Sequence, residues 1–381
     1  MDARGADTCP NDPERRRELS AWAIARAKSL GFAAAGVCEA LPSERGVELR
    51  QWIDRGSHGP MEWFAKNVEA RLDVRVMFPG ARSILVVADR YHDGTPDPDR
   101  EVLDAASGIA PTRIGRVARY ARGRDYHRRM KRRLRVLQRE FESALPGVRG
   151  KVCCDIEPFM EREHAERAGL GRCGKHTLLI IPGLGSWVLL AAYVTTALVE
   201  PTLGESSEEW GESADPCGSC TRCIDACPTQ AIVPWGVDSR RCLSSVTIEE
   251  RGTPDPEVAA RAGQWLLGCD ICQEVCPHNQ PTRRSVSAGR GADYDGRNAA
   301  FDLLEVLGWD DAKRRSAFGP SALNRVKADQ VRRNAVWCSL RVLREEPSHP
   351  LGDSIRKIAG SATESAHVQA AAHEVLARIQ A

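Results

Sequence analysis

The spacing of eight cysteines constrains this chain more than any other feature of its sequence. Four stand in a C-x2-C-x2-C-x3-C-P run that ends at Pro228, and three in a C-x2-C-x3-C-P run that ends at Pro277, with Cys242 between the runs. The first run has the spacing of two-cluster bacterial ferredoxins, in which the last cysteine of a run binds the other cluster. We therefore expect two [4Fe–4S] clusters, one held by Cys217, Cys220, Cys223 and Cys276 and the other by Cys227, Cys242, Cys269 and Cys272.

Two other uses of thiols remain as alternatives and explain the pattern less well. Structural zinc sites also contain C-x2-C pairs, but zinc ribbons use two separated pairs without a third and fourth cysteine and a trailing proline. A disulfide framework is typical of small secreted domains, whereas this chain has 381 residues and its other cysteines form no regular pattern. We therefore expect an electron-transfer protein in a reducing compartment.

The composition favours a globular protein outside the membrane. Hydrophobic residues make up 42% of the chain, and the formal net charge is only +2, so any charged binding surface must be local. The arginines at 15–17 precede an amphipathic stretch and not the apolar core of an export signal. The most apolar region, 177–199, is interrupted at 182–185 by Pro-Gly-Leu-Gly, which predicts two buried strands around a turn. We expect a cytoplasmic protein with no membrane partner.

The pattern of segments predicts three regions. Residues 1–200 alternate strand-like and helix-like stretches, with strands expected at 83–88 and 151–154 and a basic helix at 124–144, which indicates an α/β or α+β domain. Residues 201–285 hold the cysteine runs and form the expected ferredoxin-like domain. Residues 295–381 recur at helix spacing over 331–343 and 365–379, which indicates a helical, HEAT-like region. No glycine-rich phosphate loop follows a strand, so the sequence gives little support to a nucleotide cofactor.

A basic stripe runs from 113 to 139 and contains a single acidic residue, Asp125. Tyr120, Tyr126 and His127 are interleaved with it. Basic and aromatic side chains together suit a phosphate backbone with unstacked bases, although a charge run is often only a solvated helix face. Because a second basic set lies in the helical tail, we expect nucleic-acid contacts at Arg119, Arg122, Arg124, Arg325, Lys327, Arg332 and Arg333.

Asp155 is the candidate acid, because it follows a strand-like segment and precedes Glu157 and Pro158. A carboxyl group at the end of a strand can donate a proton when desolvation raises its pKa. An aspartate in such a place is more often a helix cap, and the residues alone leave both possibilities open.

Several segments in a fixed order carry a family resemblance. They are Arg71 with 78–83 (FPGARS), 118–127 (ARYARGRDYH), 154–180 (CDIEPFMEREHAERAGLGRCGKHTLLI), both cysteine runs, 241–252 (RCLSSVTIEERG) and 319–336 (GPSALNRVKADQVRRNAV). Over nearly its whole length the chain resembles the epoxyqueuosine reductases, which are cobalamin- and Fe–S-dependent enzymes acting on tRNA.

The resemblance implies that an epoxide on a modified nucleoside at the tRNA wobble position is reduced to an alkene, with loss of water. It implies cobalamin as a second cofactor and an external electron donor of the flavodoxin or ferredoxin type, and we expect a monomer. Asp155 matches the family's proton donor. Arg71 matches a residue that lines the corrinoid, and Ser244, Gly169, Gly171 and Lys175 are further candidates for the pocket wall. The histidines at 127, 164 and 176 lack the context of a cobalt ligand.

The chain departs from the family's pattern at two places. Arg172 stands where an aromatic or other apolar residue is usual, and 88–94 (ADRYHDG) replaces a more usual apolar-Asn-Tyr pattern. Three other functions are kept as alternatives to the family's activity: a reductive dehalogenase-like enzyme, a non-catalytic Fe–S electron carrier, and an RNA-binding protein with structural clusters.

Overall fold

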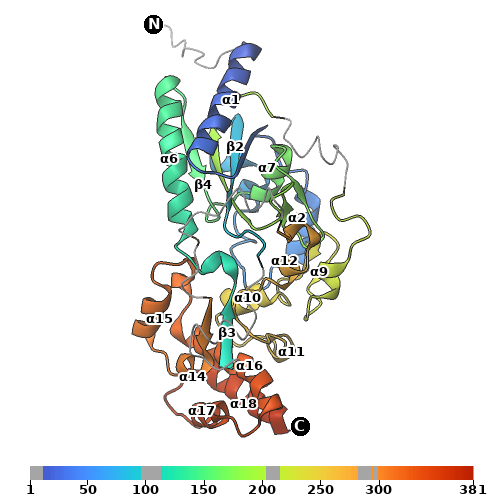
Figure 1. Ribbon diagram of the computed structural model, residues 1–381. Coiled ribbons are helices and arrows are strands. Elements are labelled where there is room, and N and C mark those ends of the chain that lie inside the picture. Colours follow the sequence, from blue (N-terminus) through green and yellow to red (C-terminus); the bar gives the residue numbers. More distant parts are fainter. Residues whose placement is uncertain (1–11, 96–112, 203–214, 282–293, 295–298, 381) are drawn as a thin grey trace.

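The computed structural model describes residues 12–95, 113–202, 215–281, 294 and 299–380. Figure 1 shows an elongated molecule, with the sheet of the N-terminal region towards one end and the last helices at the other. The cysteine-rich segments lie between these two parts. The order in space therefore follows the order of the three regions in the sequence.

A four-stranded sheet forms the centre of the N-terminal region, with its strands in the order β1-β2-β7-β4. The strands are β1 (Ala34–Glu39), β2 (Ser83–Arg90), β7 (Val188–Thr195) and β4 (Gly150–Cys153), and each neighbouring pair is antiparallel. The strands expected at 83–88 and 151–154 are confirmed, but the sheet is of the antiparallel kind. Alternation along the sequence did not reveal this, because β7 pairs on both sides with strands that lie far from it in the chain.

Helices cover both faces of this sheet. On one face α1 (Pro13–Ser29) and α6 (Tyr126–Ala144) pack against Leu85 and Val87 of β2, and on the other α7 (Glu161–Arg167) packs near Ile84 and Val86. All eight residues of β2 are consequently buried. The buried positions of α6 recur at helical spacing, which explains why the predicted basic helix forms at 126–144.

Shorter elements connect the strands. The helices α2 (Gly46–Asp54), α3 (Val68–Leu72) and α4 (Val74–Met77) lie between β1 and β2, and the hairpin of β5 (Arg172–Cys173) and β6 (Leu179–Ile180) precedes β7. The apolar region 177–199 thus forms two strands around a turn, as predicted. Within the described ranges, no helix has the length and apolar character needed to cross a membrane.

The cysteine-rich region consists of short elements joined to the rest of the chain by a small sheet. Strand β3 (Ile114–Val117) leaves the N-terminal region and pairs in parallel with β10 (Trp265–Leu267) and antiparallel with β11 (Ala300–Asp302). The 3-10 helix η2 (Arg119–Ala121) follows β3. The remaining elements of the region are α9 (Arg222–Asp225), β8 (Ile232–Val233), β9 (Gly236–Val237), α10 (Leu243–Ile248), α11 (Pro256–Ala259), α12 (Ile271–Glu274) and η3 (Pro277–Asn279).

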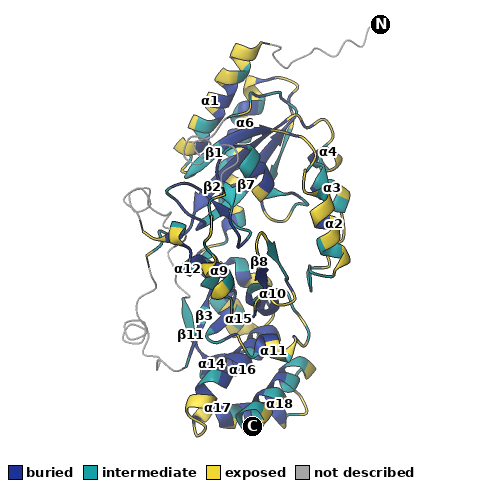
Figure 2. Ribbon diagram, turned by 90° about the vertical axis from the view of Figure 1, so that its right-hand side faces the viewer, coloured by how far each residue is buried: buried dark blue, intermediate teal, exposed yellow. Residues whose placement is uncertain are grey.

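The C-terminal region is helical, as predicted. Its elements are α14 (Leu303–Val306), α15 (Asp311–Phe318), η5 (Ala322–Arg325), α16 (Ala328–Glu345), α17 (Pro350–Ala359) and α18 (Ala366–Gln380). Helix α16 is its centre, and Figure 2 shows that most of this helix is buried. Its apolar side chains share one hydrophobic core with α10 and β10, so the helices and the cysteine-rich region pack as a continuous unit.

Candidate active site

Asp155 lies in the turn after β4, with its side chain 63% exposed. Its Oδ2 accepts a hydrogen bond from the Tyr126 hydroxyl at 2.8 Å and lies 3.0 Å from Nε2 of His127. Its backbone N–H donates to Oε1 of Glu161 at 3.0 Å, and its φ of 63° is in the left-handed region, which few residues other than glycine adopt. Contacts with Tyr126, His127 and Glu161 therefore hold the turn in a conformation that presents the carboxylate to solvent.

His127 connects Asp155 to a second carboxylate. Its Nδ1 lies 2.7 Å from Oδ1 of Asp125, the N-cap residue of α6, which also accepts the His127 backbone N–H. Burial acts to lower the pKa of His127, but the hydrogen bonds to Asp125 and Asp155 prevail and raise it to about 9. Both ring nitrogens are therefore protonated at neutral pH, and each donates to a carboxylate.

The protonation states of the two neighbouring acids differ. Burial acts to raise the pKa of Asp155, but the hydrogen bonds from His127 and Tyr126 outweigh it and the pKa falls below its usual value. Burial raises the pKa of Glu161 to about 7, and the negative charge of Asp155 adds to this rise. At neutral pH the site thus holds an ionised Asp155, a protonated His127 and a Glu161 that carries a proton part of the time.

Arg71, in α3, lies close enough to Glu161 and Asp155 for their charges to act on it. The residue is 6% exposed, and its guanidinium lies 4.4 Å from the ring centre of Phe64 and 5.1 Å from that of Trp63. Burial lowers its pKa, while the charges of Glu161 and Asp155 act in the other direction. Its Nε is buried and has no hydrogen-bond partner among the residues that the structure describes. A buried donor in this state calls for an acceptor from a bound group.

The charge interactions among the cysteine thiols follow the predicted crossed pattern in part. Burial raises the pKa of Cys276 to about 11, and the thiols that add to the rise are those of Cys217, Cys223 and Cys220. Burial also raises the pKa of Cys272, where Cys269 and Cys242 add to it, and Cys227 is a neighbour of both Cys242 and Cys269. Among the described residues, however, no group of three or more His, Cys, Asp or Glu side chains is arranged to hold a metal ion, so the two sets of four stay a prediction.

Backbone amides point at several of these sulfurs. The N–H of Lys175 lies 3.3 Å from Sγ of Cys217, and that of Ala231 lies 3.3 Å from Sγ of Cys227. Ser244 and Ser245 donate backbone hydrogen bonds to Cys242, the N-cap of α10. Donors of this kind stabilise thiolate ligands and tune the potential of a cluster.

The predicted residues of the cofactor pocket lie in several settings. Lys175 is buried, and its Nζ donates to the carbonyls of Gly218 and Cys220, so it belongs to the wall of the first cysteine group. Gly169 has a φ of 70° after the end of α7, and a Cβ at Gly171 would stand 2.1 Å from the carbonyl oxygen of Ile180. Local backbone geometry thus requires both glycines. Ser244 lies beside Cys242, at the second group.

Large apolar side chains are exposed near the same residues. Trp63 lies beside the Arg71 guanidinium, and Ile156 follows Asp155 in the sequence. The backbone N–H of Trp235 donates to the carbonyl oxygen of Lys175. Each of these three apolar side chains is at least 45% exposed. Exposed apolar surface around polar groups is typical of a binding site. The residues present can therefore accommodate a large, partly apolar group with polar substituents.

The predicted nucleic-acid contacts divide into buried and exposed side chains. Arg119 is buried and forms ion pairs with Asp270 and Glu274, and Arg122 is buried and donates to the Val117 carbonyl. Arg333 is fully buried and donates to the carbonyls of Val246, Glu250 and Gly252. For these three the structure corrects the prediction, because their donors are used within the protein.

The other four predicted contacts lie nearer the surface. Arg332 donates to the Leu307 carbonyl and pairs with Glu364, while Arg325 is 50% exposed and pairs with Glu249. The positive charge of Arg325 also acts to lower the pKa of Asp155, which places it near that carboxylate. Arg124 and Lys327 are exposed.

Comparison with known proteins assigns the family. Residues 216–279 match the model described as "4Fe-4S double cluster binding domain", and residues 71–156 match "Epoxyqueuosine reductase QueG, DUF1730". The epoxyqueuosine reductase of Synechococcus sp. (strain CC9605) is 37% identical over 337 residues, which cover 84% of this chain and 95% of that protein. That of Burkholderia pseudomallei (strain K96243) is 34% identical over 362 residues, which cover 91% of this chain and 87% of that protein. This chain belongs to the epoxyqueuosine reductase family.

Solved structures of the family share the fold. A crystal structure of selenomethionine-labelled epoxyqueuosine reductase superposes with a TM-score of 0.80 at 25% identity, over 95% of this chain and 90% of that one. A second structure, of epoxyqueuosine reductase with an epoxyqueuosine-modified stem loop of tRNA-Tyr, superposes with a TM-score of 0.76 at 24% identity over 96% and 99%. The family assignment identifies the activity as that of an oxidoreductase with a double [4Fe–4S] domain, and it decides against zinc, disulfides and a non-catalytic role.

The two departures from the epoxyqueuosine reductase pattern have different settings. Asp89, in the 88–94 segment, is buried at the end of β2, where it accepts from Tyr294 and pairs with Arg129 and Arg133 of α6. The acidic residue thus has a structural partner in the basic helix. Arg172 lies in β5, is partly exposed, and pairs in register with Ile180.

Sequence reasoning missed the roles of Tyr126, His127 and Glu161 around Asp155. The signal for the first two was present in the ARYARGRDYH segment, which places them directly after the Asp125 cap.

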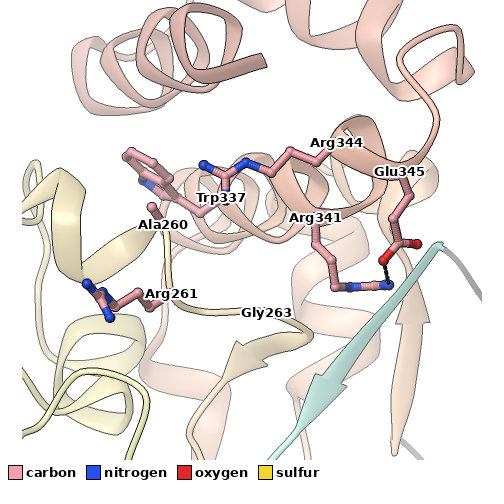
Figure 3. A pocket seen from close by; sticks show the side chains of 7 residues that line it. All are labelled: Ala260, Arg261, Gly263, Trp337, Arg341, Arg344 and Glu345. Carbon is pink, nitrogen blue, oxygen red and sulfur yellow. Dashed lines mark ion pairs between the residues drawn. The ribbon is translucent and has the colours of Figure 1, made fainter. Parts of the chain in front are cut away.

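A cavity of about 300 Å³, shown in Figure 3, lies elsewhere, between the turn after α11 and α16. It is lined by Ala260, Arg261, Gly263, Trp337, Arg341, Arg344 and Glu345, and no predicted catalytic residue faces it.

Proposed function

We propose that this chain reduces epoxyqueuosine to queuosine at the wobble position of tRNA, with Asp155 delivering a proton to the epoxide oxygen. The reaction consumes two electrons and two protons and releases water. The observation that carries the proposal is the hydrogen-bonded row Asp125–His127–Asp155, which faces solvent beside an exposed apolar surface. A row of this kind supplies protons to a substrate that docks from outside.

The clusters and cobalamin are the cofactors of the proposed reaction. The thiols of the two cysteine groups would hold the clusters, which supply one-electron transfer from a flavodoxin- or ferredoxin-type donor. Arg71, with its buried and unsatisfied Nε, and the apolar surface of Trp63 and Ile156 would contact cobalamin. Cobalamin, when bound, supplies a cobalt centre that passes electrons to the substrate. Gly169, Gly171 and Ser244 remain proposed neighbours of this pocket, and Lys175 is proposed to support the first cluster instead.

The protein's own residues handle the proton. With His127 protonated and Asp155 ionised, a proton moves along the 3.0 Å contact from Nε2 to Oδ2 as negative charge develops on the substrate oxygen. Asp125 keeps His127 charged, and Tyr126 orients the Asp155 carboxylate through its hydroxyl. The His127 side chain is 19% exposed, which allows solvent to replace the proton for the second transfer.

The tRNA contacts are proposed at three exposed basic residues, Arg124, Arg325 and Lys327, of which Arg325 lies near Asp155. Positive side chains in this position attract phosphates to the side of the site where the carboxylate is presented. A related structure contains a tRNA stem loop, which supports the same class of substrate here. We further propose a monomer in the cytoplasm, because the cluster thiols require a reducing compartment.

The experiment is anaerobic reconstitution with iron and sulfide, with and without cobalamin, followed by incubation with reductant and epoxyqueuosine-containing tRNA. The proposal predicts that nucleosides lose one oxygen only when clusters and cobalamin are both present. Loss of the oxygen without cobalamin would refute the cofactor assignment. An enzyme that binds both cofactors but does not turn over would refute the substrate assignment. The variant Arg172→Leu would then test whether the arginine at this position changes the substrate specificity.

A further inference from the structure

Four arginines form a row along the outer side of α6. They are Arg128, Arg132, Arg135 and Arg139, referred to here as the α6 row, and all four are exposed. At about 100° per residue, they fall within roughly 60° of the helix circumference. The row therefore forms one narrow positive strip, opposite the face that packs on the sheet.

The α6 row has few counter-charges in the described part of the chain: Asp125 lies near Arg128 and Glu140 near Arg139. None of its side chains makes a hydrogen bond or ion pair with the part of the chain that the structure describes. The other charged residues of α6 are engaged: Arg129 and Arg133 pair with Asp89, Lys131 pairs with Glu157, and Glu140 pairs with Arg26. Glu142 accepts hydrogen bonds from Gln138 and Tyr193. The charged residues on the flanks of the helix thus form ion pairs, whereas the arginines of the row form none with the described residues.

The like charges of the α6 row destabilise the helix. Successive members are three or four residues apart, and like charges at these spacings repel and destabilise a helix. Folding gains nothing from placing four arginines here, because lysine, glutamate or glutamine would form the helix equally well. A benefit must therefore come from outside the chain, from an anionic partner.

The row begins beside the catalytic residues. Arg128 follows His127 directly, and from there the row extends by about 16 Å along the helix. Figure 1 shows that α6 stands at the outside of the molecule, along the N-terminal region, where a long ligand can reach it. A partner that binds the row and also reaches Asp155 must be extended and must carry regularly spaced negative charges.

We propose that the α6 row binds the phosphate backbone of the tRNA arm that carries the reacting nucleoside. This inference rests on the proposed function and adds a binding surface to it. Consecutive row residues stand about 5–6 Å apart at Cβ, and their guanidinium groups can each contact phosphate oxygens as the backbone passes. Protein interfaces are built around apolar centres, and none of the large exposed apolar side chains of the described chain lies on α6. The charge pattern therefore fits RNA better than an acidic protein.

The test measures tRNA binding by the holoenzyme over a range of salt concentrations. The variant R132E/R135E removes two contacts at the centre of the row, and R17E/R55E is the matched control at two other exposed arginines that lack ion pairs within the described chain. Each phosphate contact contributes roughly −0.7 to −0.9 to the slope of log K against log salt, so the slope should become shallower by about 1.5. We expect at least about tenfold weaker binding at 0.15 M salt for the row variant and no change for the control.

The readouts separate this inference from the proposed function. The kcat at saturating tRNA should stay near the wild-type value, because no row residue touches Asp155, and R132K/R135K should restore most of the affinity. Unchanged affinity and slope in an active R132E/R135E enzyme would overturn the inference alone. A wild-type enzyme that turns over no epoxyqueuosine substrate would instead overturn the proposed function. If R132E/R135E instead slows reduction of the clusters by an acidic flavodoxin and leaves tRNA affinity unchanged, the α6 row binds the electron donor, and the inference is also overturned.

Discussion

Replacing Asp125 with asparagine tests how the site holds its proton. Asparagine is nearly as good an N-cap as aspartate, so α6 should still begin at the same residue. The amide oxygen can still accept from Nδ1 of His127, which keeps the ring in place. The substitution therefore removes one negative charge from the hydrogen-bonded group Asp125–His127–Asp155 and leaves the geometry of that group intact.

The expected magnitude follows from the two carboxylates that face His127. Together they raise the pKa of His127 from 6.5 to about 9, against the effect of burial. The loss of one carboxylate should lower this pKa by at least about one unit, which corresponds to about 1.4 kcal/mol. The other charged groups near Asp125, His127 and Asp155 stay in place, namely Arg128, Glu161, Arg71 and Arg325. At pH 9 the protonated fraction of His127 falls from about one half to about one tenth.

The assay is kcat/KM for epoxyqueuosine-containing tRNA between pH 6 and pH 10. Because a protonated His127 is required, the wild-type rate should decline as pH rises through about 9. In Asp125→Asn the decline should begin about one unit lower, so that the rate at pH 9 is about fivefold below the wild type and the rate at pH 6.5 is nearly unchanged. The His127 pKa, measured by NMR of the labelled ring, should move by the same amount.

A matched control is Asp329→Asn, which removes the carboxylate 3.3 Å from His367 in the C-terminal helices. That variant should leave the pH profile unchanged. If the alkaline limb of Asp125→Asn coincides with that of the wild type, or if the measured pKa of His127 lies below 7, the proton is not held on His127 and the reasoning is wrong.

Three further outcomes follow from the site and its supports. Cys272→Ala should lower bound iron from about eight to about four atoms per chain and stop turnover, whereas Cys338→Ala, in the helical core, should retain the full iron content in a metal analysis. Since the folded-state pKa of Glu161 is raised to about 7, the stability that it contributes is present at acid pH and is lost as pH rises through 7. Glu161→Gln should therefore unfold at higher denaturant concentration than the wild type at pH 8, by about 1 kcal/mol or more, and the difference should vanish near pH 4. Arg333→Ala should lower the free energy of unfolding by about 3–5 kcal/mol, because it leaves the buried carbonyls of Val246, Glu250 and Gly252 without their donor. Lys327→Ala, at an exposed side chain, should leave stability unchanged and weaken tRNA binding.

The sequence predicted the features that depend on local spacing. The cysteine runs predicted the double [4Fe–4S] domain, which the family model matches at residues 216–279, since the positions of thiols in short turns follow from their separation in the chain. The basic helix expected at 124–144 forms at Tyr126–Ala144, and the strand expected at 83–88 is part of β2. These patterns are read within a window of about twenty residues.

Features that depend on distant partners were not predictable in this way. Arg119 and Arg333 have the charge of surface residues, but their acceptors, Asp270 and the carbonyls of 246–252, lie about 80 to 150 residues away in the chain. A basic pattern cannot reveal that such partners will fold over it. The antiparallel sheet was missed for a similar reason, because β7 inserts between two strands that precede it.

For Asp155 the sequence predicted the position after a strand correctly but not the direction of its pKa shift. Its position after a strand was enough to make it a candidate acid, but the sequence suggested that desolvation would raise its pKa. In the structure its pKa is lowered by His127 and Tyr126, which come from the start of α6. The proton is therefore held one hydrogen bond away from the residue predicted to deliver it.

The central claim is that Asp155 passes a proton to an epoxide that is reduced by electrons from the clusters. The most direct measurement is the mass of the modified nucleoside in tRNA after a single turnover with reduced, cobalamin-loaded enzyme. Wild-type enzyme should remove one oxygen, and Asp155→Asn should remove none while its clusters remain fully reduced and tRNA remains bound. Loss of the oxygen at the wild-type rate in Asp155→Asn would contradict the account.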